Sequence, residues 1–559
     1  AEDTVGNIAI TGNVIGATSV AISTDQGNIE LGTSGADGVA TAVQAGTTLG
    51  VSTTTAGNVT VNGSLKTAAV NGSTVGDVTV SAAEGKVTLT KAGDATNVID
   101  SGKDIVVTAI NVVDPSSSDT EGDIDINSGL KAAGAVTVHA YKLDGTASGT
   151  GDITLDGAVT AGTAVDIAAN TGNVTIGGTT ASKVQAGTTL AVKTLTDGDV
   201  AVTGQLVTTG ADASTVTVSA KDGNVTLTKD GNVTLTKDGS ADEVIKSAKD
   251  VSISASDSGE NGVDGVGDIT VNGNVKAATT AEISTDQGNI TVGTAAATAP
   301  STTTAAPVTI PSGSGLTVES TKSGDINVTG KLVTADDATV EGITTGDVNV
   351  KTAAGDIVLN YGTGDDKDVV NSSKAALVQT GAGDIDVTGN VIGATTATLD
   401  GKEGHVNLTG NLTANNGLAK IQAYDEAEAA ESNDDGNITV KGNVVSDTDG
   451  VTITTTNGDI TVGTAEATPG AVKAVKALEI STAGTGDVTV NGNLKTTGAD
   501  YGTVTVTATE GKVTLNKYGS VAGTTTPAAD YVIDSANSVS VTASDKDGVD
   551  NLGNINVNG

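Results

Sequence analysis

Hydrophobic and polar residues alternate along most of this chain, in short stretches that begin with glycine. The recurring motif is Gly, then Asp or Asn, then Ile or Val, then any residue, then Ile, Leu or Val, as in "GDITV" at Gly267–Val271. Alternation with a period of two predicts a strand with one buried face. The glycine allows an unusual backbone angle, and the Asp or Asn side chain can bond the local backbone. Each motif therefore predicts a corner followed by a strand.

The spacing of this motif predicts the fold class. It begins at Gly6, Gly27, Gly57, Gly76, Gly122, Gly151, Gly172, Gly198, Gly223, Gly231, Gly267, Gly288, Gly324, Gly346, Gly355, Gly383, Gly436, Gly458, Gly486 and Gly553. Several of these intervals are 21 residues, for example Gly6 to Gly27 and Gly151 to Gly172. Short, near-constant periods are typical of solenoids. We therefore predict an all-β fold, a long parallel β-helix (β-solenoid) of roughly 20–25 residues per coil, with no separate globular domain.

A longer period is superimposed on the short one. The segment "VGDITVNGNVKAATTAEISTDQGNITVGT" at Val266–Thr294 nearly repeats Val5–Thr33, and Gly151, Gly267 and Gly383 are spaced by 116 residues. The predicted organisation is block 1 at 1–121, a short insert at 122–150, block 2 at 151–266, block 3 at 267–382, a longer insert at 383–435, block 4 at 436–552 and the start of an unfinished coil at 553–559. The four blocks end on the related segments "VIDSGKDIVVTA", "VIKSAKDVSISA", "VVNSSKAALVQT" and "VIDSANSVSVTA".

Composition supports a thin core. The chain has no Cys, Met, Trp, Phe or Arg, and six Tyr supply all its aromatic area. A globular core would use bulky filler residues, whereas Val, Ile and Leu can fill the narrow layers of a solenoid. The predicted inward positions of the repeated segment are Ile269, Val271, Val275, Ile283, Ile290 and Val292, with counterparts at Ile8, Ile10, Val14, Ile22, Ile29 and Leu31.

Net charge limits the partners. At −39, the chain lacks the clustered cations that nucleic-acid binding needs, and anionic lipid would repel it. No apolar run is long enough to span a membrane. The first residues, "AEDT", suit a cleaved signal-peptide junction, so we expect export to the cell surface or the extracellular space.

Stacked corners raise the question of metal binding. Acidic corners would place like charges above one another, and the interspersed Asn residues would relieve repulsion and permit amide ladders. Calcium, which prefers oxygen ligands, is the one candidate cofactor. The candidate ligands are Asp347, Asp356, Asp365, Asp366 and Asp368. The alternative is that these side chains cap turns in solvent.

Enzymatic activity is not expected. A polysaccharide-active β-helix usually needs an aromatic platform and a basic residue or carboxylate pair, and Arg, Trp and Phe are absent. His139 and His405 lie in non-equivalent segments without a nearby Ser or Cys partner, and both are expected to face solvent. A polysaccharide-active enzyme and an ice-binding protein that uses threonine rows are minor alternatives.

The runs "GDITVNGNVKAATTAEISTDQGNITVGT" and "GNLTANNGLAKIQAY" resemble the repeats of filamentous-haemagglutinin-like exoproteins. The resemblance is one of repeat style, and the secretion domain of that family is not seen among these residues. It implies a right-handed parallel β-helix at a bacterial surface, without enzymatic activity.

Two functional hypotheses follow. The first is an extracellular structural subunit of a fibre, sheath or surface layer, in which solenoids stack head to tail as a homopolymer. Its expected self-assembly interface comprises Val5, Asn7, Ile8, Ile10, Asn554, Ile555 and Val557. The alternative is a monomeric cell-surface adhesin stalk, with other surface proteins or glycans as candidate partners.

Overall fold

The structure is a computed structural model of the chain, and it divides into two compact units, unit 1 at Ala1–Ala278 and unit 2 at Thr279–Gly559. The residues that it describes are 6–33, 40–67, 76–91, 96–111, 122–141, 149–178, 181–210, 214–228, 243–257, 267–293, 308–334, 346–361, 367–424, 436–464, 470–517, 531–545 and 553–558. Among them every regular element is a β-strand.

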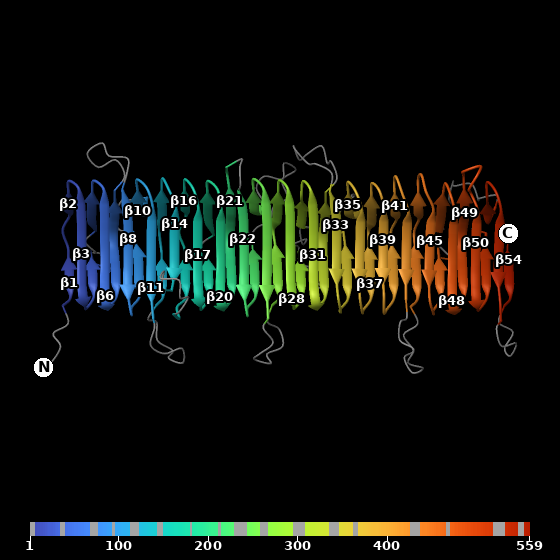
Figure 1. The fold of residues 1–559 in the computed structure, drawn as a ribbon, viewed down its shortest axis with the longest axis horizontal. Coiled ribbons are helices and arrows are strands. Elements are labelled where there is room, and N and C mark those ends of the chain that lie inside the picture. The colour runs from blue at the N-terminus through green and yellow to red at the C-terminus, as the bar shows by residue number, and fades with distance from the viewer. Residues whose placement is uncertain are drawn as a thin grey trace, which may run out of the picture. The chain divides into compact units, whose positions relative to one another are not determined.

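In unit 1, successive strands turn through three faces before the next coil begins (Figure 1). Face 1 contains β1 (Ile8–Ile10), β4 (Ile29–Leu31), β7 (Val59–Lys66), β9 (Val87–Thr90), β12 (Ile124–Ile126), β15 (Ile153–Leu155), β18 (Val174–Ile176), β21 (Val200–Thr208), β23 (Val225–Thr228) and β26 (Ile269–Asn272). Face 2 contains β2 (Val14–Gly16), β5 (Thr41–Ala45), β10 (Asn97–Ser101), β13 (Gly129–Ala132), β16 (Val159–Ala161), β19 (Ser182–Ala186), β24 (Glu243–Ser247) and β27 (Asn274–Ala277), together with the second halves of β7 and β21. Face 3 contains β3 (Ser19–Gln26), β6 (Thr48–Ala56), β8 (Asp77–Ala83), β11 (Ile105–Ile110), β14 (Val136–Ala140), β17 (Val165–Thr171), β20 (Leu190–Asp197), β22 (Thr215–Lys221) and β25 (Asp250–Ser256).

Unit 2 repeats the same three faces. Face 1 contains β29 (Ile290–Val292), β32 (Ile326–Val333), β34 (Ile357–Asn360), β37 (Ile385–Thr388), β40 (Val406–Thr409), β43 (Ile438–Lys441), β46 (Ile460–Val462), β49 (Val488–Thr496), β51 (Val513–Asn516) and β54 (Ile555–Asn558). Face 2 contains β30 (Val308–Pro311), β35 (Asp368–Ser372), β38 (Asn390–Gly393), β41 (Leu412–Ala414), β44 (Val444–Ser446), β47 (Gly470–Ala474) and β52 (Ile533–Asp534), together with the second halves of β32 and β49. Face 3 contains β28 (Thr280–Gln287), β31 (Gly315–Ser323), β33 (Asp347–Thr352), β36 (Ala376–Thr380), β39 (Ala397–Gly401), β42 (Ala419–Ala423), β45 (Val451–Thr455), β48 (Leu478–Thr485), β50 (Val504–Glu510) and β53 (Val539–Ala543).

Each strand pairs in parallel with the equivalent strand of the neighbouring coil, which confirms the predicted β-solenoid. In the shortest coils the register advances by 21 residues, as from Ile8 to Ile29. In the longest it advances by 44, from Val225 to Ile269. The register is kept because the additional residues lie between the strands. The predicted coil length therefore describes the shorter coils.

The core consists of aliphatic rows that run along the stack inside each unit. All six predicted inward side chains of the repeated segment, from Ile269 to Val292, are fully buried. In the counterpart coil, Ile29 and Leu31 are fully buried, whereas Ile8 and Ile10 are only half-buried. Among the described residues, β1 has a face 1 neighbour, β4, on one side only. Burial of each aliphatic side chain contributes about 1.5–3 kcal/mol, so these rows supply the main driving force for stacking.

The corner glycines allow successive coils to approach closely. Gly198 has a φ of +137°, and a Cβ atom there would collide with the carbonyl oxygen of Gly172 in the preceding coil. Gly57 has a φ of +138°, and a Cβ atom there would likewise collide with the carbonyl oxygen of Gly27. These positions therefore require glycine for two reasons, backbone angle and space.

We predict that Gly198→Ala destabilises its coil by about 1–3 kcal/mol, because the new Cβ forces both a strained angle and a clash. Hydrogen–deuterium exchange of β18, β21 and β23 measures this local effect. The matched control is Gly50→Ala in β6, where a Cβ would have no atom within 4 Å. Equal exchange in the two variants would contradict the argument.

Candidate functional site

Side chains at the start of face 1 form a ladder along each unit, here called the corner ladder. Its residues are Asn7, Asn28, Asn58, Lys86, Asp123, Asp152, Asn173, Asp199, Asn224 and Asp268 in unit 1, and Asn289, Asp325, Asp356, Asp384, His405, Asn437, Asp459, Asp487 and Lys512 in unit 2. Within each unit, the side chain of each Asp or Asn accepts the backbone N–H of the next ladder residue, at 2.7 Å from Asn173 to Asp152 and 2.8 Å from Asp384 to Asp356. The N–H donors stabilise the carboxylates, since hydrogen bonds to ionised acceptors are the stronger ones.

The expectation of amide ladders is met at a different place from the corners. Asn516 donates its side-chain amide to Asn491 Oδ1 at 2.7 Å, and Asn558 donates to Asn516 Oδ1 at 2.8 Å. These residues follow the inward pairs of face 1 strands. At the corners the side chains bond the backbone instead, because each Oδ1 lies next to an N–H of the neighbouring coil.

Lys86 interrupts the ladder of unit 1. Its ammonium group lies 2.6 Å from Asp125 and 3.9 Å from Asp123. Burial raises the pKa of Asp123, and the N–H of Asp152 and the charge of Lys86 offset this effect only in part. The lysine therefore replaces a hydrogen-bonded rung by an ion pair.

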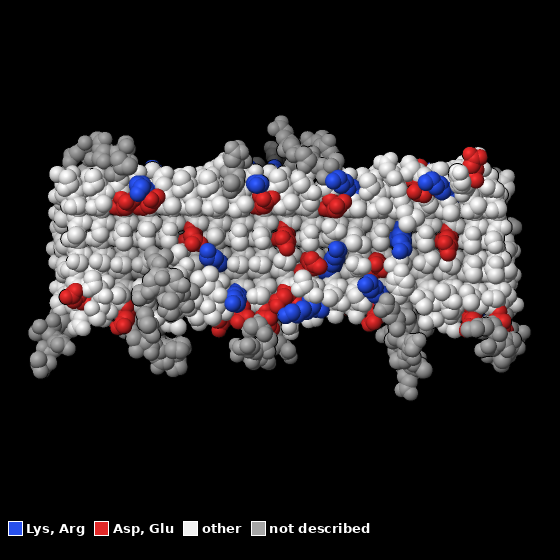
Figure 2. Space-filling model, viewed as in Figure 1, with Lys and Arg blue, Asp and Glu red and all other residues white. Residues whose placement is uncertain are grey.

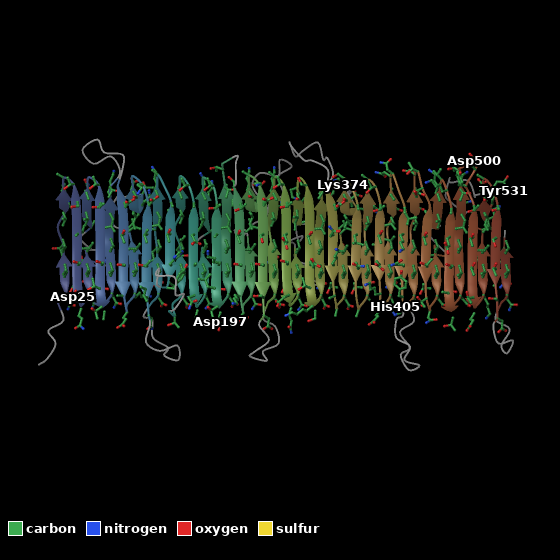
Figure 3. All side chains as sticks on the ribbon, viewed as in Figure 1. Asp25, Asp197, Lys374, His405, Asp500 and Tyr531 are labelled. Carbon is green, nitrogen blue, oxygen red and sulfur yellow. The ribbon has the colours of Figure 1, made fainter. Side chains whose placement is uncertain are left out.

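His405 provides the ladder's one aromatic rung among the described residues. Its backbone N–H donates to Asp384 Oδ1 at 2.7 Å, and its Nδ1 accepts the N–H of Asn437 at 3.2 Å. The side chain is half-buried at the rim where face 3 meets face 1 (Figure 3). An imidazole nitrogen that accepts a hydrogen bond carries no proton there, so Nδ1 of His405 takes the place that Oδ1 has in the Asp and Asn rungs.

The candidate calcium ligands are separated in the structure. Asp347 begins β33 and accepts the N–H of Ala375 at 3.0 Å, whereas Asp356 follows the other end of that strand in the corner ladder. Asp368 accepts the side-chain amide of Asn390 at 2.9 Å. Asp365 and Asp366 lie outside the described residues. No three His, Cys, Asp or Glu side chains in the described ranges form a metal-binding group, and calcium binding stays a prediction.

The expectation for His139 is wrong: its side chain is only 5% exposed. It lies on β14, where Nε2 is 2.9 Å from Asp166 Oδ2 and the ring stacks on Tyr141 at 4.5 Å between centroids. Lys193 Nζ is 2.9 Å from the other oxygen of Asp166. Three adjacent face 3 strands thus join one cation and one imidazole to a single carboxylate. His139 Nδ1 is buried without a hydrogen-bond partner among the described residues.

The electrostatics of this cluster are asymmetric. Burial alone would raise the pKa of Asp166, but hydrogen bonds from His139 and Lys193 outweigh it and lower the pKa below its ordinary value. Burial, together with the charge of Asp166, raises the pKa of Tyr141. The carboxylate is therefore held ionised next to a phenol held neutral.

A second buried carboxylate lies on face 3 of unit 2. Asp400 on β39 accepts side-chain amide hydrogen bonds from Gln379 at 2.7 Å and from Gln422 at 2.5 Å. All three residues occupy the same register position on adjacent strands. Both clusters serve packing between coils, because the buried carboxylates of Asp166 and Asp400 are each bound by side chains of the two neighbouring strands.

Charged residues elsewhere on face 3 are sparse and mostly mixed in sign (Figure 2). At the rim between faces 2 and 3, Lys103 lies 3.3 Å from Asp77 and Lys476 lies 3.2 Å from Asp449. Such exposed pairs contribute little to stability.

The predicted assembly residues lie on the outermost described strands. Ile555 and Val557 of β54 are 46% and 57% exposed, although their register partners Val513 and Leu515 are fully buried. Ile8 and Ile10 on β1 are the half-buried residues described above. Asn7 accepts the N–H of Asn28 in the corner ladder, and the carbonyl of Asn554 accepts the N–H of Val513. Val5 lies outside the described residues.

A serine at the turn between face 2 and face 3 recurs in all four blocks, and it was not identified from the sequence. Each serine donates to the carbonyl three residues later, at 2.7–3.0 Å, and lies 3.3–3.4 Å from a threonine hydroxyl of the preceding coil. The pairs are Thr67 with Ser101, Thr208 with Ser247, Thr334 with Ser372 and Thr496 with Ser535. The same serine occupies one position in all four block-ending segments, and this repetition could have indicated its structural role.

Fold and sites together define a repeat protein of the all-β parallel β-solenoid class. No family model, curated protein or solved structure matches the chain. In the part of the chain that the structure describes, no helix has the length and apolarity to cross a membrane.

We predict that Asp166→Asn destabilises unit 1 at about pH 7, and that the difference from the parent protein shrinks as the pH falls below about 3.9. Because the folded pKa of Asp166 is lowered, its contribution is complete above the unfolded value of about 3.9, declines below that value and is lost as the pH falls through the folded pKa. Thermal unfolding of both proteins across this range measures the effect. Asp197→Asn, at an exposed site, controls for the lost charge. A pH-independent difference would contradict the assigned ion pairing.

We predict that His405→Leu weakens the coil by about 1 kcal/mol, because the N–H of Asn437 loses its acceptor. His405→Asn is the matched control, since Asn is an ordinary residue of the ladder and supplies Oδ1. Exchange of the Asn437 amide should quicken in the leucine variant only. If both variants exchange alike, the Nδ1 contact carries no stability.

Proposed function

We propose that this protein is a non-enzymatic structural subunit that assembles by end-to-end stacking of β-solenoids into a fibre, sheath or surface layer. The observation that carries the proposal is the self-compatible repeat: strands of the common motif stack on one another in register, and β54 carries the same aliphatic pair, Ile555 and Val557, that other coils of unit 2 bury. Among the described strands β54 pairs with β51 alone, and a further coil in the same register would cover both side chains. Unpaired strand edges bind other strands readily.

The repeat itself makes a second copy a suitable occupant. Both β1 and β54 follow a Gly–Asn corner of the common motif. Strands of this motif already stack on one another inside each unit, β12 on β15 and β43 on β46. In both cases two aliphatic inward residues lie over two others in register. β1 of one molecule can therefore continue the rows of β54 in another by the same contacts.

Charge would regulate this assembly. Two molecules of net charge −39 repel each other, while the contact itself is apolar. Salt screens such repulsion over about 10 Å at 0.1 M and leaves the hydrophobic term in place. Assembly should therefore increase with ionic strength.

The proposed location is extracellular or at the cell surface, after export by a cleaved signal peptide, with no nucleic-acid partner. The described polar clusters support a non-enzymatic role, because Asp166 and Asp400 are engaged in contacts between neighbouring strands. Calcium is a candidate ligand only, and the assembly contact does not require it.

We predict that Val557→Lys abolishes end-to-end assembly, because an ammonium group would replace a side chain at the apolar edge. Electron microscopy and sedimentation of the mature chain, with termini determined by mass spectrometry, measure filament formation at rising salt. The matched control is Asn556→Lys, one position away and on the outward side of β54. Isolated particles at all salt and calcium levels would overturn the proposal and favour the adhesin-stalk alternative.

A further inference from the structure

An open groove lies on unit 2 where faces 2 and 3 meet. It has a volume of about 440 Å³ and lies across the starts of the adjacent strands β45, β48 and β50. Leu418, Gly450 and Ala477 contribute apolar surface to the groove. Asp449, Lys476 and Tyr501 also line it. Binding sites for small molecules combine such apolar surface with a few placed polar groups, in volumes of about 300–1,000 Å³.

The polar side of the groove is held by hydrogen bonds. Lys476 Nζ lies 3.2 Å from Asp449 Oδ1, and the N–H of Gly450 donates to the same oxygen at 2.9 Å. The N–H of Lys476 also donates to the carbonyl of Asp449 at 3.0 Å. Asp449 Oδ2 has no hydrogen bond within the described ranges. The groove therefore presents a fixed acceptor next to the donors of an ammonium group.

Tyr501 supplies an aromatic surface at this groove. Its side chain is 71% exposed, in the turn that precedes β50. The turn is closed by backbone bonds, from Gly502 to Gly498 and from Thr503 to the Tyr501 carbonyl, both at 2.8 Å. The adjacent Asp500 lies at the rim of the face 3 strands (Figure 3). The hydrogen bonds hold the backbone of the turn, and the ring itself stays exposed.

The internal repeat carries a different residue at the position of this ring. "TTGADYGTVTV" at Thr496–Val506 corresponds to "TTGADASTVTV" at Thr208–Val218, where Ala213 takes the place of Tyr501. A tyrosine that leaves most of its side chain in water gains little for folding. In a chain with six aromatic residues, its placement at a groove favours a binding role.

From this geometry we propose that the groove binds one sugar ring of a neutral saccharide. The C–H face of a pyranose ring packs on an aromatic side chain, and its hydroxyl groups bond both to carboxylates and to ammonium groups. Asp449, Asp500 and Lys476 give the groove a net negative charge, so uronate or sulfated sugars would be repelled. The groove is shallow and open, which suits one ring within a longer chain. This proposal does not depend on end-to-end assembly.

The test is titration of the full chain with maltohexaose, cellohexaose and chitohexaose, measured by saturation-transfer NMR and tyrosine fluorescence. We expect at least one to bind, and Tyr501→Ala to weaken it about tenfold, which corresponds to about 1.4 kcal/mol. The matched control is Tyr531→Ala, which removes another exposed tyrosine that does not line the groove. Hexagalacturonate should bind at least about fivefold more weakly than the neutral ligand, because of its charge.

Three results would overturn the proposal. They are no binding of any neutral hexasaccharide up to about 10 mM, equal loss in the two tyrosine variants, and preference for hexagalacturonate. Filament formation by Tyr501→Ala, measured in parallel, separates this result from the assembly proposal, because Tyr501 is not among the proposed edge contacts. Val557→Lys should retain saccharide binding for the same reason.

Discussion

The structure depends on parallel stacking of coils in register, because each coil obtains its backbone hydrogen bonds and its hydrophobic neighbours from the next. Close approach is possible only where the corners carry no side chain, as at Gly57 and Gly198. The aliphatic rows then lie directly over one another and exclude water from a narrow interior. Among the described residues β54 has a neighbouring strand of face 1 on one side only, and its Ile555 and Val557 are exposed.

Stacking also concentrates polar groups, and the fold resolves this problem locally. In the corner ladder, carboxylates from successive coils are separated by backbone N–H donors, as between Asp356 and Asp384. Where a lysine takes the corner, as at Lys86, ion pairs replace the rung. On face 3, Asp166 is bound by an imidazole and an ammonium group, and Asp400 by two amides. A strongly acidic chain can thus form a continuous core within each unit.

The two proposals use different consequences of the same repeat. Assembly would use what is common to coils, namely inward aliphatic residues and a free strand edge of a self-compatible type. Saccharide binding would use a departure from the repeat, in which block 4 carries Tyr501 at a position where block 2 carries alanine. A regular scaffold can therefore provide polymer contacts at its edges and specific contacts at individual turns.

By itself, the sequence determined the strand class, the inward rows and the glycine corners, because these follow from period-two alternation and local backbone angles. Ile269, Val271 and Ile290 were placed correctly in the core on that basis. The sequence shows a serine repeated in the block-ending segments, but it does not show that each serine meets a threonine hydroxyl of the preceding coil. Only the tertiary structure decided that His139 meets Asp166, that His405 enters the corner ladder and that Tyr501 lies at a groove. These neighbours are separated by a full coil, and coil length varies from 21 to 44 residues with the segments between strands. Contacts between coils therefore depend on a register that the packed core sets.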